Sequence, residues 1–428
     1  LLPGATTMSK PADTIGKELH NDKSLFDACS NGDLPLVQSM LKHSKEKNNI
    51  FAASIQEEET GLSPLMAAAR NGQLEICRIL LDEGAPWNAV DRQGKCAGNY
   101  ATENEHWDVV NLLVDAGTQA ELILGASIRL AMKSDTNQGD DDHEDAYDLT
   151  KENKDSNKPV ELEPCSKPDY LQRNVRYNAE NTLLLDDDDD AVMMQWERPL
   201  MDAHASIITS NGRKGTVVLN IGFGLGIIDT ALQKYDLALH VIIEAHPTVH
   251  QKMINDGWGK KSNVRICFGR WQEELPKLLD EGISFDGMFY DTYAESFTDL
   301  EDFHTLVSKG LKKPDGIYSF FNGLAPDNIF FHGVACQCVK VQLEQMGFEV
   351  EFAQCEIQVD EKEWNGVRRK YWFGRETYYL PIITWNKSKL PENLEGSEVG
   401  SQVTETDETK ADEANENDGV KNKKVKKS

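Results

Sequence analysis

The segment Thr216-Val-Val-Leu-Asn-Ile-Gly-Phe-Gly-Leu-Gly226, followed by Ile227-Ile-Asp-Thr-Ala-Leu-Gln-Lys234, decides the fold. A largely apolar run, a glycine-rich turn and a helical stretch predict a buried strand, a tight turn and a helix in this order. Glycine adopts positive φ and lets the backbone approach a ligand closely, so the arrangement is typical of a nucleotide-type site. Three glycines alone are a weak signal, and support has to come from the segments around them.

A carboxylate ends the next predicted strand. Leu239-His-Val-Ile-Ile243 is followed by Glu244, 22 residues after Gly222. A carboxylate at this place can accept hydrogen bonds from both ribose hydroxyls of a bound nucleoside. Two classes compete for such a site, a dinucleotide-binding dehydrogenase and a class I methyltransferase. The spacing Gly-x-Gly-x-Gly, in place of Gly-x-Gly-x-x-Gly, favours a smaller nucleoside without a pyrophosphate and hence the methyltransferase.

The alternation of strands and helices continues toward the C-terminus. Residues 264–268 and 285–291 are predicted as strands, and residues 272–280 as a helix between them. The second of these strands brings Asp291 to the carboxyl edge of the sheet, where open α/β sheets bind their ligands. Trp271 follows the strand at residues 264–268. Its ring is expected either to lie against an adenine or to be packed in the core. The predicted fold class is α/β, with a Rossmann-like seven-stranded sheet.

A period of 33 residues organises residues 21–133. Gly61 begins one copy, Gly94 restarts the pattern 33 residues later, and an earlier copy begins at Leu25. Period and motif resemble those of ankyrin repeats, in which each copy supplies two short helices that pack on their neighbours. The third copy is degenerate, with Cys96-Ala-Gly-Asn99 at the motif position. Two roles fit this all-α domain: docking a protein partner, or stabilising an enzyme.

Composition divides the rest of the 428-residue chain. Residues 1–20 and 387–428 are predicted to be disordered, residues 134–168 to be an acidic disordered linker, and residues 169–386 to be the catalytic domain. A net charge of −27 argues against broad nucleic-acid binding, and no apolar run predicts a membrane span. Eight cysteines without a C-x2-C pair predict reduced thiols and no metal site. The lysines within 423–427 are either a nuclear signal or a solubilising end.

Several segments carry a family resemblance. They are Val192-Met-Met-Gln-Trp-Glu-Arg-Pro-Leu-Met201, Asn220-Ile-Gly-Phe-Gly224, Ile242-Ile-Glu244, Gly269-Arg-Trp271, Phe285-Asp-Gly-Met-Phe-Tyr-Asp-Thr-Tyr293 and Tyr378-Tyr379. Over about residues 175–384 they strongly resemble guanidinoacetate methyltransferase, which shows W-E-T-P-Y-M, E-V-G-F-G, F-D-G-I-L-Y-D-T-Y and Y-Y in the same order. With the repeats added, the chain resembles the fungal protein arginine N5-methyltransferases (type IV), which act on a protein of the large ribosomal subunit.

The resemblance implies a cofactor, a substrate and a set of site residues. The cofactor is S-adenosyl-L-methionine, the substrate is a ribosomal protein, and Glu197 and Asp291 are the catalytic residues that hold its guanidinium. We expect a cytoplasmic protein, and a nuclear one as well if the terminal lysines are a signal. The residues implied around the cofactor are Met193, Met201, Gly222, Phe223, Gly224, Leu225, Gly226, Ile227, Glu244, Ala245, His246, Arg270, Trp271 and Asp291, with Tyr177 closing over it.

The chemistry of a guanidino group agrees with two carboxylates in these places. A guanidinium is protonated near neutral pH and is a poor nucleophile because its lone pair is delocalised. Two carboxylates that grip its planar fork concentrate the positive charge on the outer nitrogens, so the inner nitrogen regains lone-pair character. We expect Asp291 to accept the departing proton and Glu197 chiefly to orient the group. In arginine, the nitrogen equivalent to the methylated one of guanidinoacetate is the internal δ nitrogen.

Two other functions stay open at this point. One is a small-molecule guanidino methyltransferase with an ankyrin appendage, although a diffusible metabolite needs no docking surface. The other is a scaffold with an inactive methyltransferase fold, against which the joint presence of the glycines, Glu244, Glu197 and Asp291 argues.

Four features depart from the family pattern or add to it. Asn220 stands where an acid usually ends the first strand, and Arg198 stands where the relative has Thr and would pair with Glu197 in the absence of substrate. Residues 360–373 look longer than their counterpart, and either shape specificity for a protein substrate or form an exposed hairpin. The five aspartates at 186–190 either steer a basic substrate or form a solvated loop.

Overall fold

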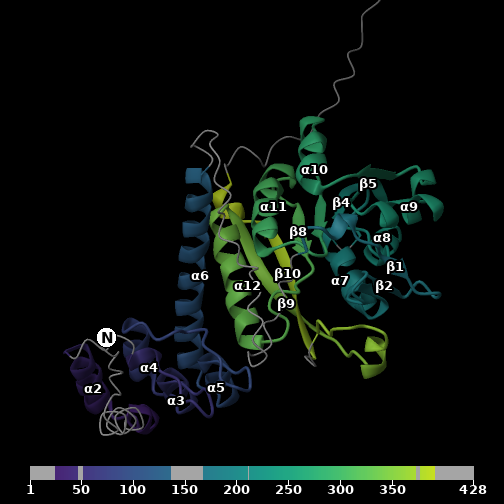
Figure 1. Ribbon diagram of the computed structural model, residues 1–428. Coiled ribbons are helices and arrows are strands. Elements are labelled where there is room, and N and C mark those ends of the chain that lie inside the picture. Colours follow the sequence, from purple (N-terminus) through teal and green to yellow (C-terminus); the bar gives the residue numbers. More distant parts are fainter. Residues whose placement is uncertain (1–24, 47–51, 136–166, 211, 373–375, 391–428) are drawn as a thin grey trace, which may run out of the picture. The chain divides into compact units, whose positions relative to one another are not determined.

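The computed structural model describes residues 25–46, 52–135, 167–210, 212–372 and 376–390 (Figure 1). The predictions for residues 1–20, for most of the linker 134–168 and for the C-terminal lysines lie outside the described residues.

A seven-stranded sheet forms the centre of the catalytic domain, in the order β6-β5-β4-β7-β8-β10-β9. Strands β4 to β8 are parallel, and β10 runs antiparallel to both β8 and β9. The predicted fold class, a class I methyltransferase sheet, is therefore confirmed. The strands span Thr216–Ile221 (β4), Leu237–Glu244 (β5), Val264–Phe268 (β6), Gly287–Tyr290 (β7), Ile317–Phe320 (β8), Phe348–Glu356 (β9) and Thr377–Trp385 (β10).

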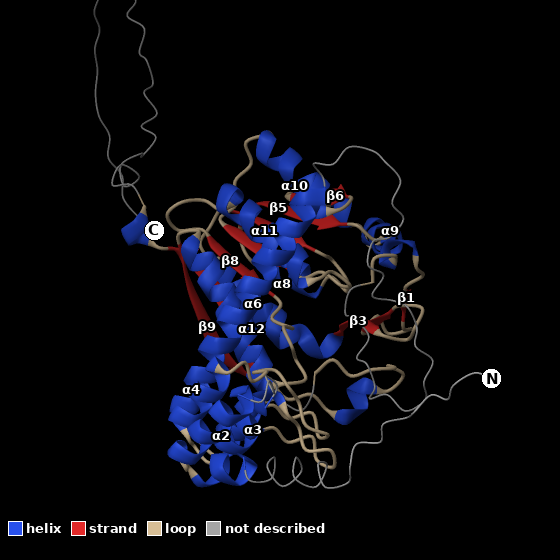
Figure 2. Ribbon diagram, turned by 60° about the vertical axis from the view of Figure 1, so that its left-hand side comes forward, coloured by secondary structure: helices blue, strands red, loops and turns tan. Residues whose placement is uncertain are grey.

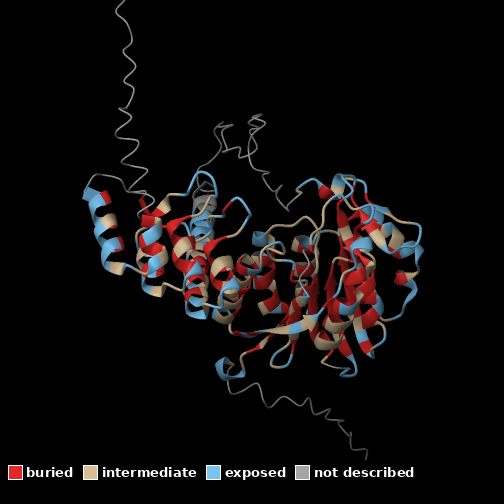
Figure 3. Cartoon of the chain, turned by 90° about the horizontal axis from the view of Figure 1, so that it is seen from below, coloured by how far each residue is buried: buried red, intermediate tan, exposed pale blue. Residues whose placement is uncertain are grey.

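Helices cover both faces of this sheet, because most of its strands are apolar on both sides (Figure 2). The helices α10, α11 and α12 share one apolar core with the strands, and α7 and α8 share another. Figure 3 shows how densely the buried residues gather along the sheet. These helices are Arg198–Ile208 (α7), Ile227–Leu232 (α8), Pro247–Asn255 (α9), Trp271–Asp280 (α10), Phe297–Gly310 (α11) and Ile329–Gln345 (α12).

A smaller three-stranded sheet precedes α7. It consists of Arg176–Tyr177 (β1), Leu183–Leu185 (β2) and Ala191–Met194 (β3), which pair in antiparallel order β1-β2-β3. The short helices of this domain are Tyr170–Gln172 (η2), Gln195–Glu197 (η3), Trp258–Lys260 (η4), Glu361–Trp364 (η5) and Lys387–Lys389 (η6). The turn η3 joins β3 to α7, and it therefore carries Glu197 to the start of that helix.

The repeats form three helix pairs, as the period predicts. The first pair is residues 25–31 with Leu34–Glu46 (α2), the second Pro64–Arg70 (α3) with Leu74–Asp82 (α4), and the third Ala97–Glu103 (α5) with Trp107–Asp135 (α6); Ala52–Ser54 (η1) lies between the first two. The expectation of short helices is wrong for α6, which has 29 residues. Its stretch Trp107–Leu130 is long and apolar enough to cross a membrane, by length and composition only. Here the helix instead lies along α12 (Figure 1).

The degenerate third copy is a contact surface for the catalytic domain. A Cβ atom on Gly98 would lie 2.1 Å from the ring of Phe330 on α12, so only glycine fits at this position. The neighbouring Asn99 exchanges two side-chain hydrogen bonds with Asn328, of 3.1 and 2.9 Å. Phe330, together with Val334 and Cys338, belongs to the apolar core of the repeats. The repeats thus share a core with the enzyme, which gives the stabilising role a physical basis.

Both predicted boundaries of the catalytic domain are too narrow. The backbone N–H of Lys167, which the prediction assigned to the linker, donates to the carbonyl of Ala294 at 3.0 Å. At the other end Leu390, assigned to the tail, packs against the sheet core. The polar composition of both segments predicted disorder. The two contacts could not be predicted from it, because each is made with residues far away in sequence.

We predict that Gly98→Ala lowers the thermal midpoint of unfolding. The added methyl group must displace the Phe330 ring, and overpacking of this kind costs roughly 1–3 kcal/mol. The control is Gly125→Ala in α6, where the nearest atom to the new Cβ is 3.5 Å away. Alanine in a helix gains roughly 0.5–1 kcal/mol over glycine, so this control should be neutral or stabilising. Equal thermal midpoints of unfolding for Gly98→Ala and Gly125→Ala would contradict the close contact between Gly98 and Phe330.

Candidate active site

The glycine loop passes between two walls that exclude side chains. Gly222, Gly224 and Gly226 all have positive φ, of 89°, 53° and 68°. A Cβ on Gly222 would lie 2.0 Å from the carbonyl oxygen of Asp291, and one on Gly224 would lie 2.7 Å from the Met193 sulfur. Glycine is therefore required here both by backbone conformation and by lack of space.

Glu244 ends β5 beside this loop. One carboxylate oxygen accepts the N–H of Phe223 at 2.8 Å, and the other accepts the N–H of His246 at 2.6 Å. Burial raises the pKa of the Glu244 carboxyl, and these backbone hydrogen bonds oppose the rise. Each carboxylate oxygen has a second lone pair, so Glu244 can still accept hydrogen bonds from a ligand.

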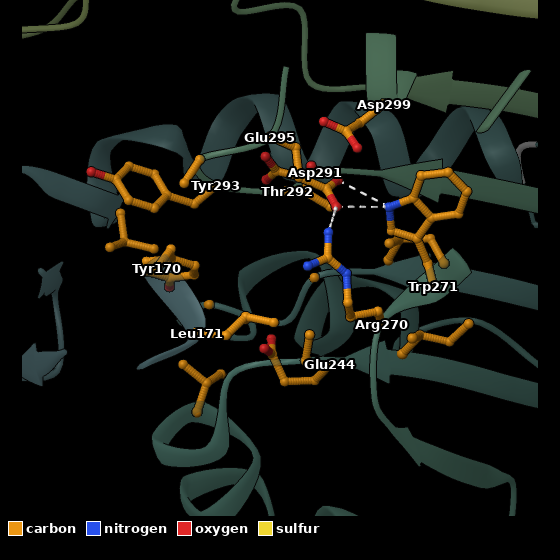
Figure 4. Close-up of a pocket in the computed structure, with 18 of the residues that line it drawn as sticks. Tyr170, Leu171, Glu244, Arg270, Trp271, Asp291, Thr292, Tyr293, Glu295 and Asp299 are labelled. Atoms are coloured by element: carbon orange, nitrogen blue, oxygen red, sulfur yellow. Dashed lines mark hydrogen bonds and ion pairs between the residues drawn. The ribbon is translucent and has the colours of Figure 1, made fainter. Parts of the chain in front are cut away.

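A cavity of about 320 Å³ opens over the loop. Figure 4 shows Glu244 on one side and the segment from Asp291 to Glu295 on the other, with Trp271 and Tyr170 at the flanks. The cavity is within the size range of small-molecule sites. The residues from the predicted set that line it are Met193, Gly222, Gly224, Glu244, Ala245, Arg270, Trp271 and Asp291.

The structure does not bring the other predicted residues to the cavity wall. Met201, Phe223 and Ile227 are buried in the apolar cores, because their side chains point away from the ligand edge. Gly226 caps α8, and the N–H of Leu225 lies 3.2 Å from the Met193 sulfur.

Tyr177 and His246 have supporting contacts instead. The Tyr177 hydroxyl donates to the Gly224 carbonyl at 3.0 Å, and therefore braces the loop from outside. His246 is the N-cap of α9, where its ring accepts the N–H of Thr248. Both residues hold the cofactor loop or its neighbours without lining the cavity.

Trp271 is packed in the core and also lines the cavity, so its contact with an adenine ring stays a prediction. Its indole N–H donates to Glu295 at 2.9 Å, and its ring packs edge-on against Phe303 at 5.2 Å. It is 4% exposed, yet it lines the cavity. Figure 4 shows this contact, together with the Arg270 guanidinium that reaches toward the same Glu295 carboxylate at 4.0 Å.

Sequence reasoning missed several wall residues. Tyr293 and Glu295 follow β7 directly, and their place just past Asp291 is a signal that could have identified them. Lys167 and Tyr170 come from the segment before β1, and no local pattern marks them. They reach the cavity through contacts with residues distant in sequence, such as the ion pair of Lys167 with Asp186 at 2.5 Å.

Glu197 and Asp291 are the two carboxylates predicted to hold a guanidinium, and of these two only Asp291 is among the residues that line the cavity. Glu197 is 3% exposed, and its Oε1 accepts the N–H of Met194 at 3.0 Å and the hydroxyl of Tyr371. Asp291 lines the cavity, and within the described residues its carboxylate accepts no hydrogen bond. No lysine or arginine of the described chain forms an ion pair with either of them.

Burial raises the pKa of both carboxyls. For Glu197 desolvation is the largest cause, and the nearby charge of Asp291 adds to it, while the Tyr371 hydroxyl opposes it. For Asp291 desolvation is again the largest cause, followed by the charge of Asp229. Two enclosed carboxylates without a protein cation fit a flat cationic ligand that donates several hydrogen bonds.

Two of the departures from the family pattern have structural explanations. Arg198 faces the side-chain amide of Gln195, so the expected pairing with Glu197 is wrong, and Tyr371 takes that place. Asn220 is fully buried and donates to both oxygens of Asp229, at 2.9 and 3.0 Å. Asn220 is therefore held inside the fold by Asp229 of α8, and neither residue lines the cavity.

The aspartates at 186–190 form an ion-paired loop, in which the three middle residues are exposed. Lys167 forms ion pairs with three of them, Asp186, Asp188 and Asp190, at 2.5, 3.2 and 3.0 Å. Arg173, Arg176 and Arg368 pair with the same loop. The exposed aspartates agree with a surface loop, which the basic residues hold in place, and steering of a substrate stays a prediction.

Comparison with known proteins adds the family. The family model of guanidinoacetate N-methyltransferase matches residues 161–330, and that of ankyrin repeats matches three copies over residues 25–122. A Yarrowia lipolytica protein named protein arginine N-methyltransferase 2 is 34% identical over 380 residues, which cover 73% of this chain and 79% of that protein. Proteins of the same name are 32% identical in Aspergillus oryzae (88% and 100% covered) and 33% identical in Saccharomyces cerevisiae (78% and 86%).

We predict that Asp291→Asn stabilises the protein at alkaline pH and not at acidic pH. Burial raises the pKa of both Glu197 and Asp291, so between the ordinary carboxyl pKa and the raised values the folded protein binds more protons than the unfolded chain. Stability therefore falls as pH rises from the ordinary carboxyl pKa through this range, and removing one charge relieves the loss.

Denaturant unfolding at about pH 4, near the ordinary carboxyl pKa, and at pH 8.5 measures the effect. We expect Asp291→Asn to gain roughly 1–3 kcal/mol at the higher pH and little at the lower. The control is Asp202→Asn, which removes an exposed ion pair with Lys234. A loss of stability of Asp291→Asn at pH 8.5 would contradict the claim that the two carboxylates repel each other without a protein cation.

Proposed function

This chain belongs to the protein arginine N-methyltransferase 2 family, and we propose that it uses S-adenosyl-L-methionine to methylate the internal δ nitrogen (N5) of arginine in a large-subunit ribosomal protein. The observation that carries this proposal is the pair of neighbouring buried carboxylates, Glu197 and Asp291, of which Asp291 lines a nucleoside-sized cavity. Glu197 holds the substrate from the start of α7, and Asp291 holds it from the end of β7.

The cavity supports the choice of cofactor. Gly222 and Gly224 let the backbone approach a ligand, and Glu244 has lone pairs for two ribose hydroxyls. Trp271 supplies an aromatic wall for an adenine ring. S-adenosyl-L-methionine, when bound, supplies a methyl group on a positively charged sulfur. The protein contributes the orientation of the acceptor and the removal of its proton.

The two carboxylates supply the acceptor chemistry. Glu197 and Asp291 hold the guanidinium by charge-assisted hydrogen bonds and draw its positive charge toward the bound nitrogens. The remaining nitrogen regains its lone pair and would form the bond to the methyl carbon as the bond between that carbon and the donor's sulfur breaks, which leaves the sulfur uncharged. Asp291 then accepts the proton that this nitrogen loses. A raised pKa suits Asp291 to that role, because a base works best when its pKa is near the working pH.

The same geometry supports attack by the internal nitrogen. Two carboxylates on the outer nitrogens leave the substituted nitrogen as the one that faces the methyl donor. In guanidinoacetate that nitrogen carries the acetate group, and in arginine it is the δ nitrogen. The fungal relatives carry protein arginine methylation in their name, and this supports a protein over a free metabolite as substrate.

We predict that the methyl group is found on N5. The test incubates the protein with labelled S-adenosyl-L-methionine and purified large-subunit ribosomal proteins, followed by fragmentation of the modified peptide in a mass spectrometer. Methyl groups on a terminal nitrogen would contradict the orientation proposed. Transfer to guanidinoacetate, with none to protein, would favour the small-molecule alternative that the family model over residues 161–330 keeps open.

We predict that Glu244→Ala and Asp291→Asn separate binding from turnover. Glu244→Ala should weaken cofactor binding roughly 10- to 100-fold, since it removes charge-assisted hydrogen bonds. Asp291→Asn should keep cofactor affinity near that of the wild type and nearly abolish turnover. Calorimetric titration and initial rates measure the two quantities, with Glu349→Gln on exposed β9 as control. Full activity in either site variant would overturn the role given to that residue.

A further inference from the structure

A segment between β9 and β10 packs on the turn η3, which carries Glu197. Within its described part, residues 357–372, three aromatic rings gather around Trp196, the residue before Glu197. The ring centroids of Trp364, Tyr371 and Trp372 lie 6.0, 5.8 and 6.2 Å from that of Trp196. All belong to one apolar core with Leu200 of α7. The segment is therefore a packed wall of the catalytic domain and not an exposed hairpin.

This wall reaches Glu197 through one polar group. The Tyr371 hydroxyl donates to Oε1 of Glu197, the same oxygen that accepts the Met194 N–H. Among the described residues, Oε2 of Glu197 accepts no hydrogen bond. Protein donors thus occupy one oxygen of the carboxylate and leave the other for a ligand. With one oxygen fixed by two donors, the plane of the carboxylate is fixed as well.

The connection is anchored on its far side. The Arg368 Nε donates to Asp190 at 3.0 Å, and the Arg368 N–H donates to the Asp189 carbonyl at 2.8 Å. Asp190 is in turn paired with Lys167 of the cavity wall. The aspartate loop therefore ties the segment that carries Tyr371 to the segment that lines the cofactor cavity.

We propose that Tyr371 is a positioning residue of the methyl-transfer site, which holds the Glu197 carboxylate in the orientation that receives the substrate guanidinium. The proposal rests on the proposed function, since it assumes a guanidinium as ligand. Tyr371 acts through Glu197 and is not itself a proton acceptor. Its hydroxyl also favours the ionised form of that carboxylate, which is the form that binds a cation.

The first test is Tyr371→Phe, which removes the hydroxyl and keeps the ring. We expect kcat to fall roughly 10- to 100-fold, because a hydrogen bond to a charged group is lost at the reacting site. Cofactor affinity should stay within twofold of the wild type. The acid limb of the pH–rate profile should move to higher pH, since loss of the donor raises the pKa of Glu197. A packing role alone would not move that limb.

The matched control is Tyr235→Phe, which removes the hydroxyl of a half-buried tyrosine outside the site. A double-mutant comparison adds a second readout: on a Glu197→Gln background, Tyr371→Phe should cost little further, because its target carboxylate is gone. If the phenylalanine variant does not fold, Tyr371→Leu, which also removes the hydroxyl and adds no titrating group, decides by its pH profile, and an unshifted acid limb overturns the proposal.

The rates of the wild type and of Tyr371→Phe distinguish failure of the role of Tyr371 from failure of the proposed function. A Tyr371→Phe rate equal to that of the wild type overturns the proposal, and a higher rate does so too, because it would make Tyr371 a plug that substrate must displace. If the wild-type protein itself transfers no methyl group to arginine in ribosomal proteins, the proposed function fails. If the wild type is active and Tyr371→Phe behaves like Tyr235→Phe, only the role of Tyr371 fails.

Discussion

Two carboxylates enclosed without a protein cation are the constraint on which the site depends. Glu197 and Asp291 would each be more stable in water, and burial raises the pKa of both. They persist because the surrounding structure fixes them: β7 pairs with β4, so that Gly222 packs directly on the Asp291 carbonyl, and the turn η3 carries Glu197 to α7. In the proposed function, a cationic ligand bound between them would offset this cost to folding.

The fold and the site residues could be predicted from the sequence where a short stretch of residues determines them. The strands β4 and β6 begin and end at the predicted residues, and the sheet follows from alternating apolar strands and helices. Glu244 and Asp291 were predictable because both follow a parallel strand, and such strand ends meet at one edge. The resemblance added Glu197, which no local pattern identifies.

The rest depends on contacts between distant segments, which a single sequence does not reveal. Met201 and Ile227 lie in motifs of the site, yet helix geometry turns their side chains into the core. The composition around Lys167 predicted a linker, but Lys167 forms an ion pair with Asp186 of the catalytic domain. Tyr371 lies in a segment for which an exposed hairpin was one of two predictions, but its hydroxyl donates to Glu197. Gly98 looked like decay of a repeat, although it makes room for Phe330 of the catalytic domain.

The account is tested most directly by the titration of the two carboxyls, followed by carbon-13 NMR on protein labelled at aspartate and glutamate side chains. In the free protein Glu197 and Asp291 should titrate well above the ordinary carboxyl range. Addition of an arginine-containing peptide with the bound cofactor product should lower both pKa values by roughly one unit or more, since a guanidinium favours the ionised forms. Ordinary pKa values that do not respond to the peptide would contradict a shared guanidinium cradle.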